Sequence, residues 1–74
     1  MLITVKLFAH FRNGRFKEAE RTYPDGADCL HVIHSLDFTA RDMGIVMVNG
    51  LHAALDRTLQ DRDTLALFPL VGGG

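Results

Sequence analysis

Alternation of apolar and polar side chains begins at the second residue and predicts a strand over residues 2–8. Three apolar residues share one face of this stretch: Ile3, Val5 and Leu7. A repeat of two residues is typical of a strand with one buried face. A second alternating stretch, residues 16–23, follows Asn13 and Gly14, a pair that favours a turn with positive φ. The two stretches therefore predict an antiparallel hairpin.

A short helix is predicted next. Residues 24–26 are proline, aspartate and glycine, which favour a turn, and Asp28 is placed to cap a helix N-terminus. Within residues 29–36 one apolar stripe has the spacing of a buried helix face: Leu30, Ile33 and Leu36. A helix of about two turns is marginal alone, so tertiary packing must stabilise it.

A second hairpin follows the helix, because Asn49 and Gly50 lie between two apolar runs and are the residues that a type I′ turn prefers. A polar connection then leads to a last strand over residues 64–68, with Leu65 and Leu67 on one face. This order of elements predicts an α+β domain, in which one helix packs across one face of a mixed sheet of four to five strands.

The opposite face of that sheet is less polar than full exposure to water would favour. The alternation predicts that three large apolar residues project from it: Phe8, Met47 and Phe68. A contiguous apolar patch on a small protein usually marks a surface that binds a partner. Individually exposed apolar residues are also common, so both interpretations stay open.

Length and composition predict one globular domain. The 74 residues are 47% hydrophobic and 23% charged, which is ordinary for a folded chain with a modest core. We expect residues 1–71 to form the domain and residues 72–74 to form a flexible glycine tail. The single cysteine excludes an internal disulfide, and neither a signal peptide nor a membrane-spanning run is recognisable, which predicts a cytoplasmic protein without membrane contact.

Charge is distributed unevenly along the chain. Up to Tyr23 there are five basic residues against two acidic ones, and from Pro24 onward three against seven, for a net charge of -1. The basic residues of the first part are interleaved with Glu18 and Glu20, which favours a solvated hairpin over a phosphate-binding face. We predict no nucleic-acid binding.

The side chains form no recognisable catalytic set. Ser35 lacks the glycine-flanked elbow of a nucleophilic serine, and Cys29 is best interpreted as a buried structural thiol. His31 and His34 lack a third ligand at metal-binding spacing, so no metal site is predicted. This pattern argues against an enzyme that carries its own catalytic groups.

Three glycines, Gly72 to Gly74, follow the last hydrophobic strand. Glycine lacks Cβ, so this segment can enter a cleft too narrow for other residues. Ordering it costs about 1 to 2 kcal/mol per residue in backbone entropy, which predicts a tail that is mobile until a partner binds it. A linker stub or a frayed terminus is the alternative.

Several motifs occur together in an order that resembles a known family. They are LFAHFR at residues 7–12, VNG at 48–50, DRDTLALFP at 61–69 and the terminal glycine pair. Over the whole chain this combination is similar to the ubiquitin-like sulfur-carrier proteins of the MoaD/ThiS family, which includes the small subunit of molybdopterin synthase and the thiamine-pathway carrier. The resemblance implies a β-grasp fold and a carrier function.

The resemblance also implies a chemistry and a set of partners. A separate adenylating enzyme of the MoeB/ThiF type would use ATP and magnesium to activate the carboxylate of Gly74, and sulfur from a persulfide would then replace AMP to give a thiocarboxylate. The acceptor would be an enzyme similar to the molybdopterin synthase large subunit or to thiazole synthase. The chain itself would bind no cofactor and would be a non-catalytic subunit or substrate.

The strand pattern and the resemblance together give a set of expected partner contacts, with Gly74 as the reactive terminus. The contacts are Phe8, Arg12, Met47, Phe68, Pro69, Leu70, Val71, Gly72 and Gly73. The sequence departs from the family pattern at three positions. A third glycine at position 72 and a leucine in place of a second proline at position 70 predict a more flexible tail. Arg62 stands where glycine is usual and predicts a different turn.

Alternatives of other classes stay open. Sulfur transfer in molybdopterin synthesis is preferred, and thiamine thiazole synthesis comes second. A ubiquitin-like modifier would instead join the same Gly74 to a lysine of a target protein. A plain β-grasp interaction module would never be activated, and the terminal glycine pair counts against it.

Overall fold

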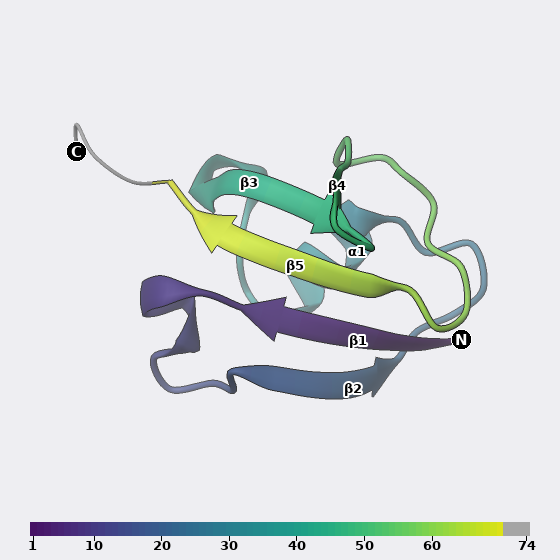
Figure 1. The fold of residues 1–74 in the computed structure, drawn as a ribbon, viewed down its shortest axis with the longest axis horizontal. Helices are drawn as coiled ribbons and strands as arrows, with labels where there is room; N and C mark the ends of the chain where they lie inside the picture. The colour runs from purple at the N-terminus through teal and green to yellow at the C-terminus, as the bar shows by residue number, and fades with distance from the viewer. Residues whose placement is uncertain (71–74) are drawn as a thin grey trace.

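The computed structural model describes residues 1–70, which fold as one mixed sheet with a helix across one face (Figure 1). The five strands are β1 (Leu2–Leu7), β2 (Glu18–Thr22), β3 (Met43–Val48), β4 (Leu51–His52) and β5 (Thr64–Pro69). Their order in the sheet is β2-β1-β5-β3-β4. The central strands β1 and β5 are parallel, and every other neighbouring pair is antiparallel. The predicted α+β architecture and both predicted hairpins are therefore confirmed.

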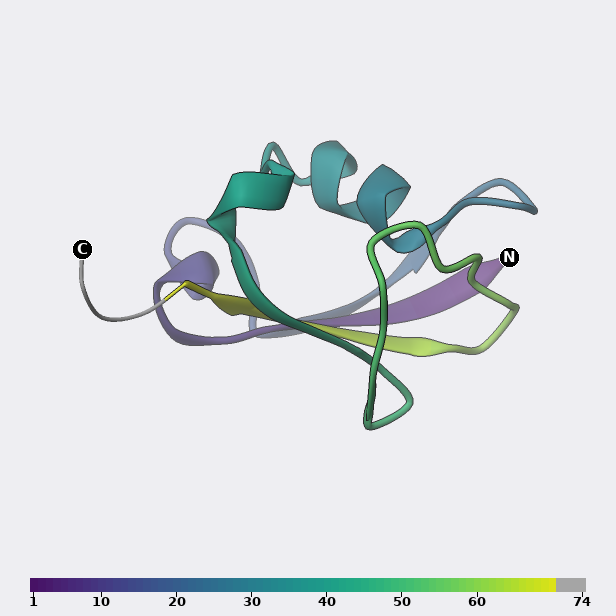
Figure 2. The same ribbon diagram turned by 90° about the horizontal axis from the view of Figure 1, so that it is seen from above.

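The hydrophobic core lies between the sheet and helix α1 (Cys29–Ser35), which covers one side of the sheet together with the 3-10 helix η2 (Ala40–Asp42) (Figure 2). The inward-facing residues of the two central strands are fully buried: Ile3, Val5, Leu7, Leu65 and Leu67. These are the residues that the alternation assigned to the buried face. Burial of each large aliphatic side chain contributes about 1.5–3 kcal/mol to folding.

The buried stripe of α1 differs from the predicted one. Leu30 is only half-buried, whereas Cys29, Val32, Ile33 and Leu36 are buried. These four positions follow the spacing i, i+3, i+4 and i+7, which describes one helix face better than the predicted spacing of three. Ile33 and Leu36 are thus buried as predicted, whereas Leu30 is not fully buried and the predicted stripe omitted Cys29 and Val32.

The first turn of α1 is stabilised by contacts that are distant in sequence. Asp28 caps the helix as predicted, because its carboxylate accepts a hydrogen bond from the backbone N–H of His31 at 2.8 Å. The backbone N–H groups of Cys29 and Leu30, the first two residues of the helix, donate to the carbonyls of Arg57 and Leu55 at 3.1 and 2.9 Å. The β4–β5 connection thus satisfies donors that a seven-residue helix cannot satisfy itself.

The loop between β1 and β2 contains a 3-10 helix, η1 (Ala9–Arg12), that the sequence pattern did not predict. Phe11 from this helix is 2% exposed and packs against Phe38, with 4.2 Å between ring centroids. Gly14 has the expected positive φ of 69°. The loop therefore closes one end of the core instead of serving only as a turn.

The β3–β4 hairpin has the predicted turn, with φ of 52° at Asn49 and 82° at Gly50. The Asn49 side chain also joins this hairpin to the start of β5, because Oδ1 accepts from the Thr64 N–H and Nδ2 donates to Asp63, both at 2.9 Å. The turn at Arg62 is the one for which the sequence predicted a departure from the family pattern. This arginine itself adopts φ of 74°, the left-handed region that glycine favours.

A β-bulge interrupts the pairing of β3 with β5 between Met43 and Ile45. Gly44 lies in this bulge, and a Cβ added there would lie 2.6 Å from the carbonyl oxygen of Pro69 and 3.0 Å from the Cα of Leu70. Both atoms belong to the backbone, so neither can move away by a side-chain rotation. Glycine at position 44 therefore fixes how closely the end of β5 approaches β3.

We expect Gly44→Ala to lower the free energy of unfolding by about 1–3 kcal/mol, because the added methyl group overpacks the bulge. Urea unfolding followed by circular dichroism measures this change. Gly14→Ala is a useful comparison, since a Cβ there meets nothing within 4 Å and only the positive φ opposes it. A Gly44→Ala protein with the wild-type midpoint would show that the end of β5 can shift without cost.

Candidate functional site

Two phenylalanines from distant parts of the sequence form the centre of the site. Phe8 follows β1 and Phe68 lies near the end of β5, and their rings stack with centroids 4.1 Å apart and planes inclined by 13°. The parallel pairing of β1 with β5 brings the two ends together, and the Phe8 N–H donates to the Leu67 carbonyl at 3.2 Å. Stacked aromatic pairs of this kind contribute about 0.5–1.5 kcal/mol beyond their burial.

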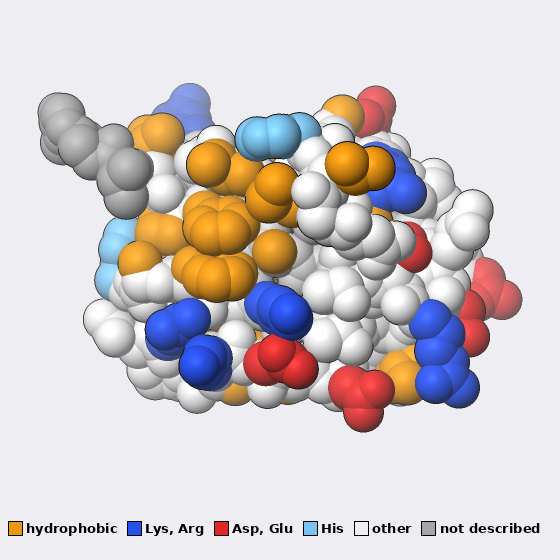
Figure 3. Space-filling view, viewed as in Figure 1, with side chains coloured by type: hydrophobic (Ala, Val, Ile, Leu, Met, Phe, Trp, Pro, Cys, Tyr) orange, Lys and Arg blue, Asp and Glu red, His pale blue; other side chains and the backbone are white. Residues whose placement is uncertain are grey.

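The apolar surface continues from Phe68 across β3. Ile45 lies opposite Phe68, and Met47 lies opposite Ala66, and residues directly opposite on antiparallel strands share a face of the sheet. We call the resulting surface the apolar patch: Phe8, Ile45, Met47, Ala66 and Phe68. Figure 3 shows hydrophobic side chains gathered on this face, opposite the side covered by α1. The predicted residues Phe8, Met47 and Phe68 are therefore part of one contiguous surface.

Ile45 is a member of the patch that the sequence analysis missed. It is 42% exposed, which is unusual for a large aliphatic side chain within a strand. Its position two residues before Met47 is the period-two spacing that could have identified it. The all-apolar run of β3 concealed this spacing, because no polar residue marked the outer face.

Arg12 borders the patch and is held by the backbone. Its Nε–H donates to the Leu7 carbonyl at 2.7 Å, and its guanidinium carbon lies 5.4 Å from the centroid of the Phe8 ring. This geometry allows a cation–π interaction and leaves the terminal nitrogens available to another group. The predicted contact residue Arg12 thus lies beside Phe8, a position that the sequence did not predict.

The last described residues differ in exposure. Pro69 is buried and pairs with Met43, whereas Leu70 is 67% exposed and donates its backbone N–H to the Asp42 carbonyl at 3.0 Å. The chain is therefore anchored to η2 as it leaves the sheet. The remaining predicted positions, Val71, Gly72, Gly73 and Gly74, lie outside the described residues, as does the predicted boundary at residue 71.

The side chains considered as possible nucleophiles, Cys29 and Ser35, contribute to packing and hydrogen bonding within the fold. Cys29 is fully buried, and desolvation raises the pKa of its thiol, so the thiol stays protonated at neutral pH. The Ser35 hydroxyl donates to the Val32 carbonyl within α1 at 2.6 Å and lies 2.9 Å from the hydroxyl of Tyr23, the residue that follows β2. Over residues 1–70 no group of three or more His, Cys, Asp or Glu residues is placed to hold a metal ion. None of the helices in this range is both long and apolar enough to span a membrane.

A hollow of about 320 Å³ lies beside β3, between η2 and the chain that follows β4. Among the described residues that line it, His52 has the only titratable side chain, and the other side chains are apolar. A substrate site normally places several polar groups around the ligand, and this hollow provides no such set. The apolar patch and the adjoining chain terminus are therefore the stronger candidate site.

Comparison with known proteins agrees with this geometry. The sequence profile of the ThiS family matches residues 5–74, which is nearly the whole chain. The chain belongs to the ThiS family. The five-stranded mixed sheet and the α-helix of residues 1–70 form the β-grasp fold that the sequence motifs implied, as in the similar solved structures. No curated protein sequence matches the chain.

Solved structures similar to this ThiS-family chain include two relatives of nearly equal length. A protein assigned as subunit 1 of the molybdopterin converting factor from Pyrococcus furiosus is 29% identical, with a TM-score of 0.79 over 96% of this chain and 99% of that one. The small archaeal modifier protein 1 of Haloferax volcanii is 26% identical, with a TM-score of 0.79 over 95% and 98% of the two chains. Subunit 1 of the molybdopterin-converting factor from Helicobacter pylori was solved in complex with subunit 2. At 19% identity and a TM-score of 0.68, over 100% of both chains, it shares the fold.

Proposed function

We propose that this ThiS-family protein is a sulfur carrier in cofactor biosynthesis. A separate enzyme transfers AMP from ATP to the carboxylate of Gly74 and releases pyrophosphate. The terminal sulfur of a persulfide then displaces AMP to form an acyl disulfide, and a second thiol cleaves its S–S bond, which leaves a disulfide on the sulfur donor and frees the thiocarboxylate. The thiocarboxylate then donates its sulfur to a cofactor precursor. The observation that carries this proposal is the family match, which extends through the terminal glycine at residue 74.

The geometry of the described residues fits a protein that presents its terminus to partners. Leu70 is anchored to η2 close to the ends of β1 and β5, where the Phe8 and Phe68 rings stack. Four further residues reach at most about 14 Å when fully extended. A partner that covers the apolar patch would therefore have the Gly74 carboxylate within reach of a nearby active site.

The side chains indicate which chemical groups the carrier would supply and which its partners would supply. The described part of the chain has a protonated buried thiol at Cys29 and no grouping of metal ligands, so its partners would supply the catalytic groups. ATP and Mg²⁺ belong to the adenylating enzyme, which would stabilise the charge that develops during acyl transfer. The carrier would contribute a reactive backbone carboxylate and a docking surface. The reaction would take place in the cytoplasm, where ATP is available.

Two kinds of partner follow from this proposal: an adenylating enzyme of the MoeB/ThiF type and a sulfur-acceptor enzyme. The likeness to a molybdopterin converting factor subunit 1 favours an acceptor similar to the large subunit of molybdopterin synthase. The Helicobacter pylori relative, which was solved with its subunit 2, is an example of such an assembly. Thiazole synthase is the acceptor that the thiamine alternative would require.

A second function is favoured by a specific likeness. The small archaeal modifier protein 1 of Haloferax volcanii has the same fold and nearly the same length. As a modifier, this chain would be activated at the same Gly74, but the acyl group would pass to a lysine amine of a target protein. The two functions therefore share the activation step and differ in the nucleophile that follows it.

The experiment that tests the proposal is the intact mass of the protein after incubation with the adenylating enzyme of its host, ATP, Mg²⁺ and a persulfide donor. The expected product has one oxygen replaced by sulfur, and omission of ATP should prevent its formation. Covalent adducts with other proteins, without the sulfur-containing species, would favour the modifier function. An unchanged mass, with an enzyme that is active on another carrier, would contradict both functions.

A further inference from the structure

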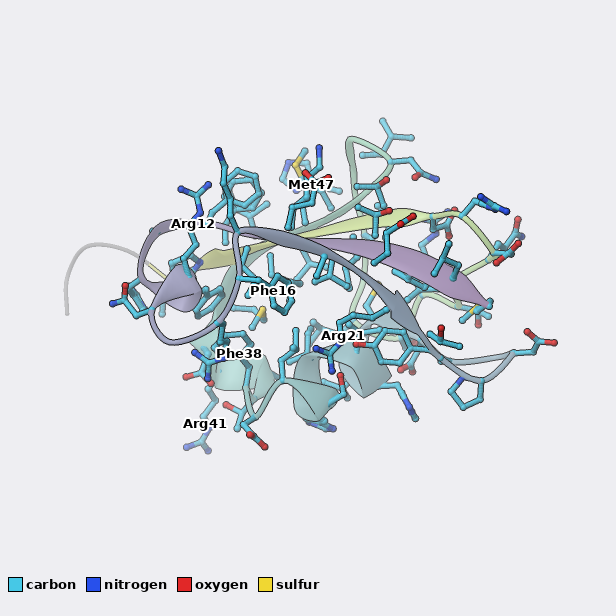
Figure 4. All side chains as sticks on the ribbon, turned by 90° about the horizontal axis from the view of Figure 1, so that it is seen from below. Arg12, Phe16, Arg21, Phe38, Arg41 and Met47 are labelled. Atoms are coloured by element: carbon cyan, nitrogen blue, oxygen red, sulfur yellow. The ribbon has the colours of Figure 1, made fainter. Side chains whose placement is uncertain are left out.

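Three exposed arginines lie at the end of the molecule where the chain leaves β5. Arg12 belongs to η1, Arg15 lies in the following loop, and Arg41 belongs to η2. We call this set the arginine band. Figure 4 shows Arg12, Phe38 and Arg41 at this end, spread from the level of the sheet to the level of the helices. The arginine band therefore extends from beside the apolar patch around to the opposite layer.

Aromatic rings support two members of the arginine band. The guanidinium carbon of Arg15 lies 4.1 Å from the centroid of the Phe38 ring, and that of Arg12 lies 5.4 Å from the centroid of the Phe8 ring. Stacking restricts the rotamers of these side chains before any partner binds. Less conformational entropy is then lost when the guanidinium groups form further hydrogen bonds.

No member of the arginine band forms an ion pair with another of residues 1–70. The ion pairs in this range involve the N-terminal amine, Lys6 and Arg62, and none involves a member of the arginine band. Asp42 is the acidic neighbour of Arg41 in sequence, but its carboxylate accepts hydrogen bonds from the N–H and hydroxyl of Thr39 at 2.8 and 3.2 Å. The guanidinium groups thus remain available for an external anion.

We propose that the arginine band docks an acidic surface of the adenylating partner, next to the opening that receives the tail. This inference rests on the proposed function and names the chemistry of the partner. Guanidinium groups bind carboxylates through paired hydrogen bonds. The spread of the arginine band across both layers suits a protein surface better than a single small anion. Nucleic acid fits less well, because the net charge is -1 and the adjacent strand β2 carries Glu18 and Glu20.

The consequence for function is electrostatic steering. Charges at the rim of an interface act mainly on the association rate, whereas buried apolar contacts act mainly on dissociation. The arginine band would turn the tail-bearing end of the carrier toward the partner before the apolar patch makes contact. This assigns different kinetic roles to two neighbouring surfaces of the protein.

Stopped-flow association of the full-length protein with the adenylating enzyme of its host tests this inference. The double variant Arg15→Gln/Arg41→Gln leaves Arg12 and its bond to Leu7 intact. We expect its association rate at low ionic strength to fall about three- to tenfold, with a weaker dependence on salt and little change in the dissociation rate. Arg57→Gln is the matched control, because Arg57 is exposed and lies in the β4–β5 connection, outside the arginine band.

Wild-type association rates in the double variant would overturn the docking role of the arginine band. An equal decrease of the association rate per removed charge in the Arg57→Gln control would do the same. A protein that binds the enzyme with the expected salt dependence but acquires no sulfur would count against the proposed function and not against the arginine band. Failure of the wild-type protein to bind the enzyme at all would overturn both proposals.

Discussion

Deletion of Gly74 is expected to abolish thiocarboxylate formation and to leave the thermal midpoint unchanged. The shortened chain still ends in two glycines, so the deletion tests the length of the tail rather than the identity of its last residues. One residue fewer places the carboxylate up to about 3.5 Å short of its position in the activating enzyme. Misplacement of a reacting group by about 1 Å can already reduce the rate about a hundredfold. The hydrophobic core ends at Leu67 and the last buried residue among residues 1–70 is Pro69, so folding should not depend on Gly74.

The measurement is intact mass after the activation reaction, together with differential scanning calorimetry. Gly72→Ala is the matched control, because it keeps the length of the chain and the terminal glycine pair while adding one methyl group. We expect this control to acquire sulfur. Sulfur transfer to the Gly74 deletion variant at the wild-type rate would show that tail length does not position the carboxylate, and would contradict this part of the proposal.

The second large effect is expected for Phe68→Arg, which should weaken binding to the adenylating enzyme by about thirtyfold or more. Phe68 lies at the centre of the apolar patch, stacked on Phe8 and opposite Ile45. An arginine there would place an unpaired charge in a desolvated interface and a second cation near Arg12, whose guanidinium lies over Phe8. Loss of the ring stack should lower the free energy of unfolding by about 0.5–1.5 kcal/mol, in addition to the effect of the changed burial at this position.

Isothermal titration calorimetry with the adenylating enzyme measures the affinity, and circular dichroism verifies the fold. Leu51→Arg adds the same charge at a leucine that is 73% exposed and pairs with Val48, outside the apolar patch. This control should bind with nearly wild-type affinity. Equal affinities of the Phe68→Arg and wild-type proteins would remove Phe68 from the docking surface.

The sequence predicted the strands and both hairpins well because these follow from local patterns. Alternation in β1, the Asn49-Gly50 turn and the cap at Asp28 each involve residues close together in the chain, and all three are confirmed. The stripe of α1 was predicted only in part, with Ile33 and Leu36 correct, because a seven-residue helix is too short for its periodicity to define one face. Helix η1 had no local pattern, and its packing depends on contact between Phe11 and the distant Phe38.

The candidate site was likewise predicted where local sequence was sufficient and missed where tertiary contacts decide. The sequence identified Phe8, Met47 and Phe68 separately, but their adjacency requires the parallel pairing of the first strand with the last. Ile45 was missed, because a run of apolar residues gives no indication of which face is buried. Gly44 was also missed. Only the close approach of the Pro69 carbonyl, which is distant in sequence, requires a residue without a Cβ at this position.

By itself, the sequence determined the order of the elements, the family and the glycine terminus, because each depends on residue types at short or fixed spacings. The tertiary structure decided which side chains meet across the sheet, which arginines stack on aromatic rings and which glycine permits the β-bulge. These features depend on distances between segments up to 60 residues apart, as with Phe8 and Phe68. Such distances are fixed only when the core packs, since burial of the apolar residues on both central strands sets the register of the whole sheet.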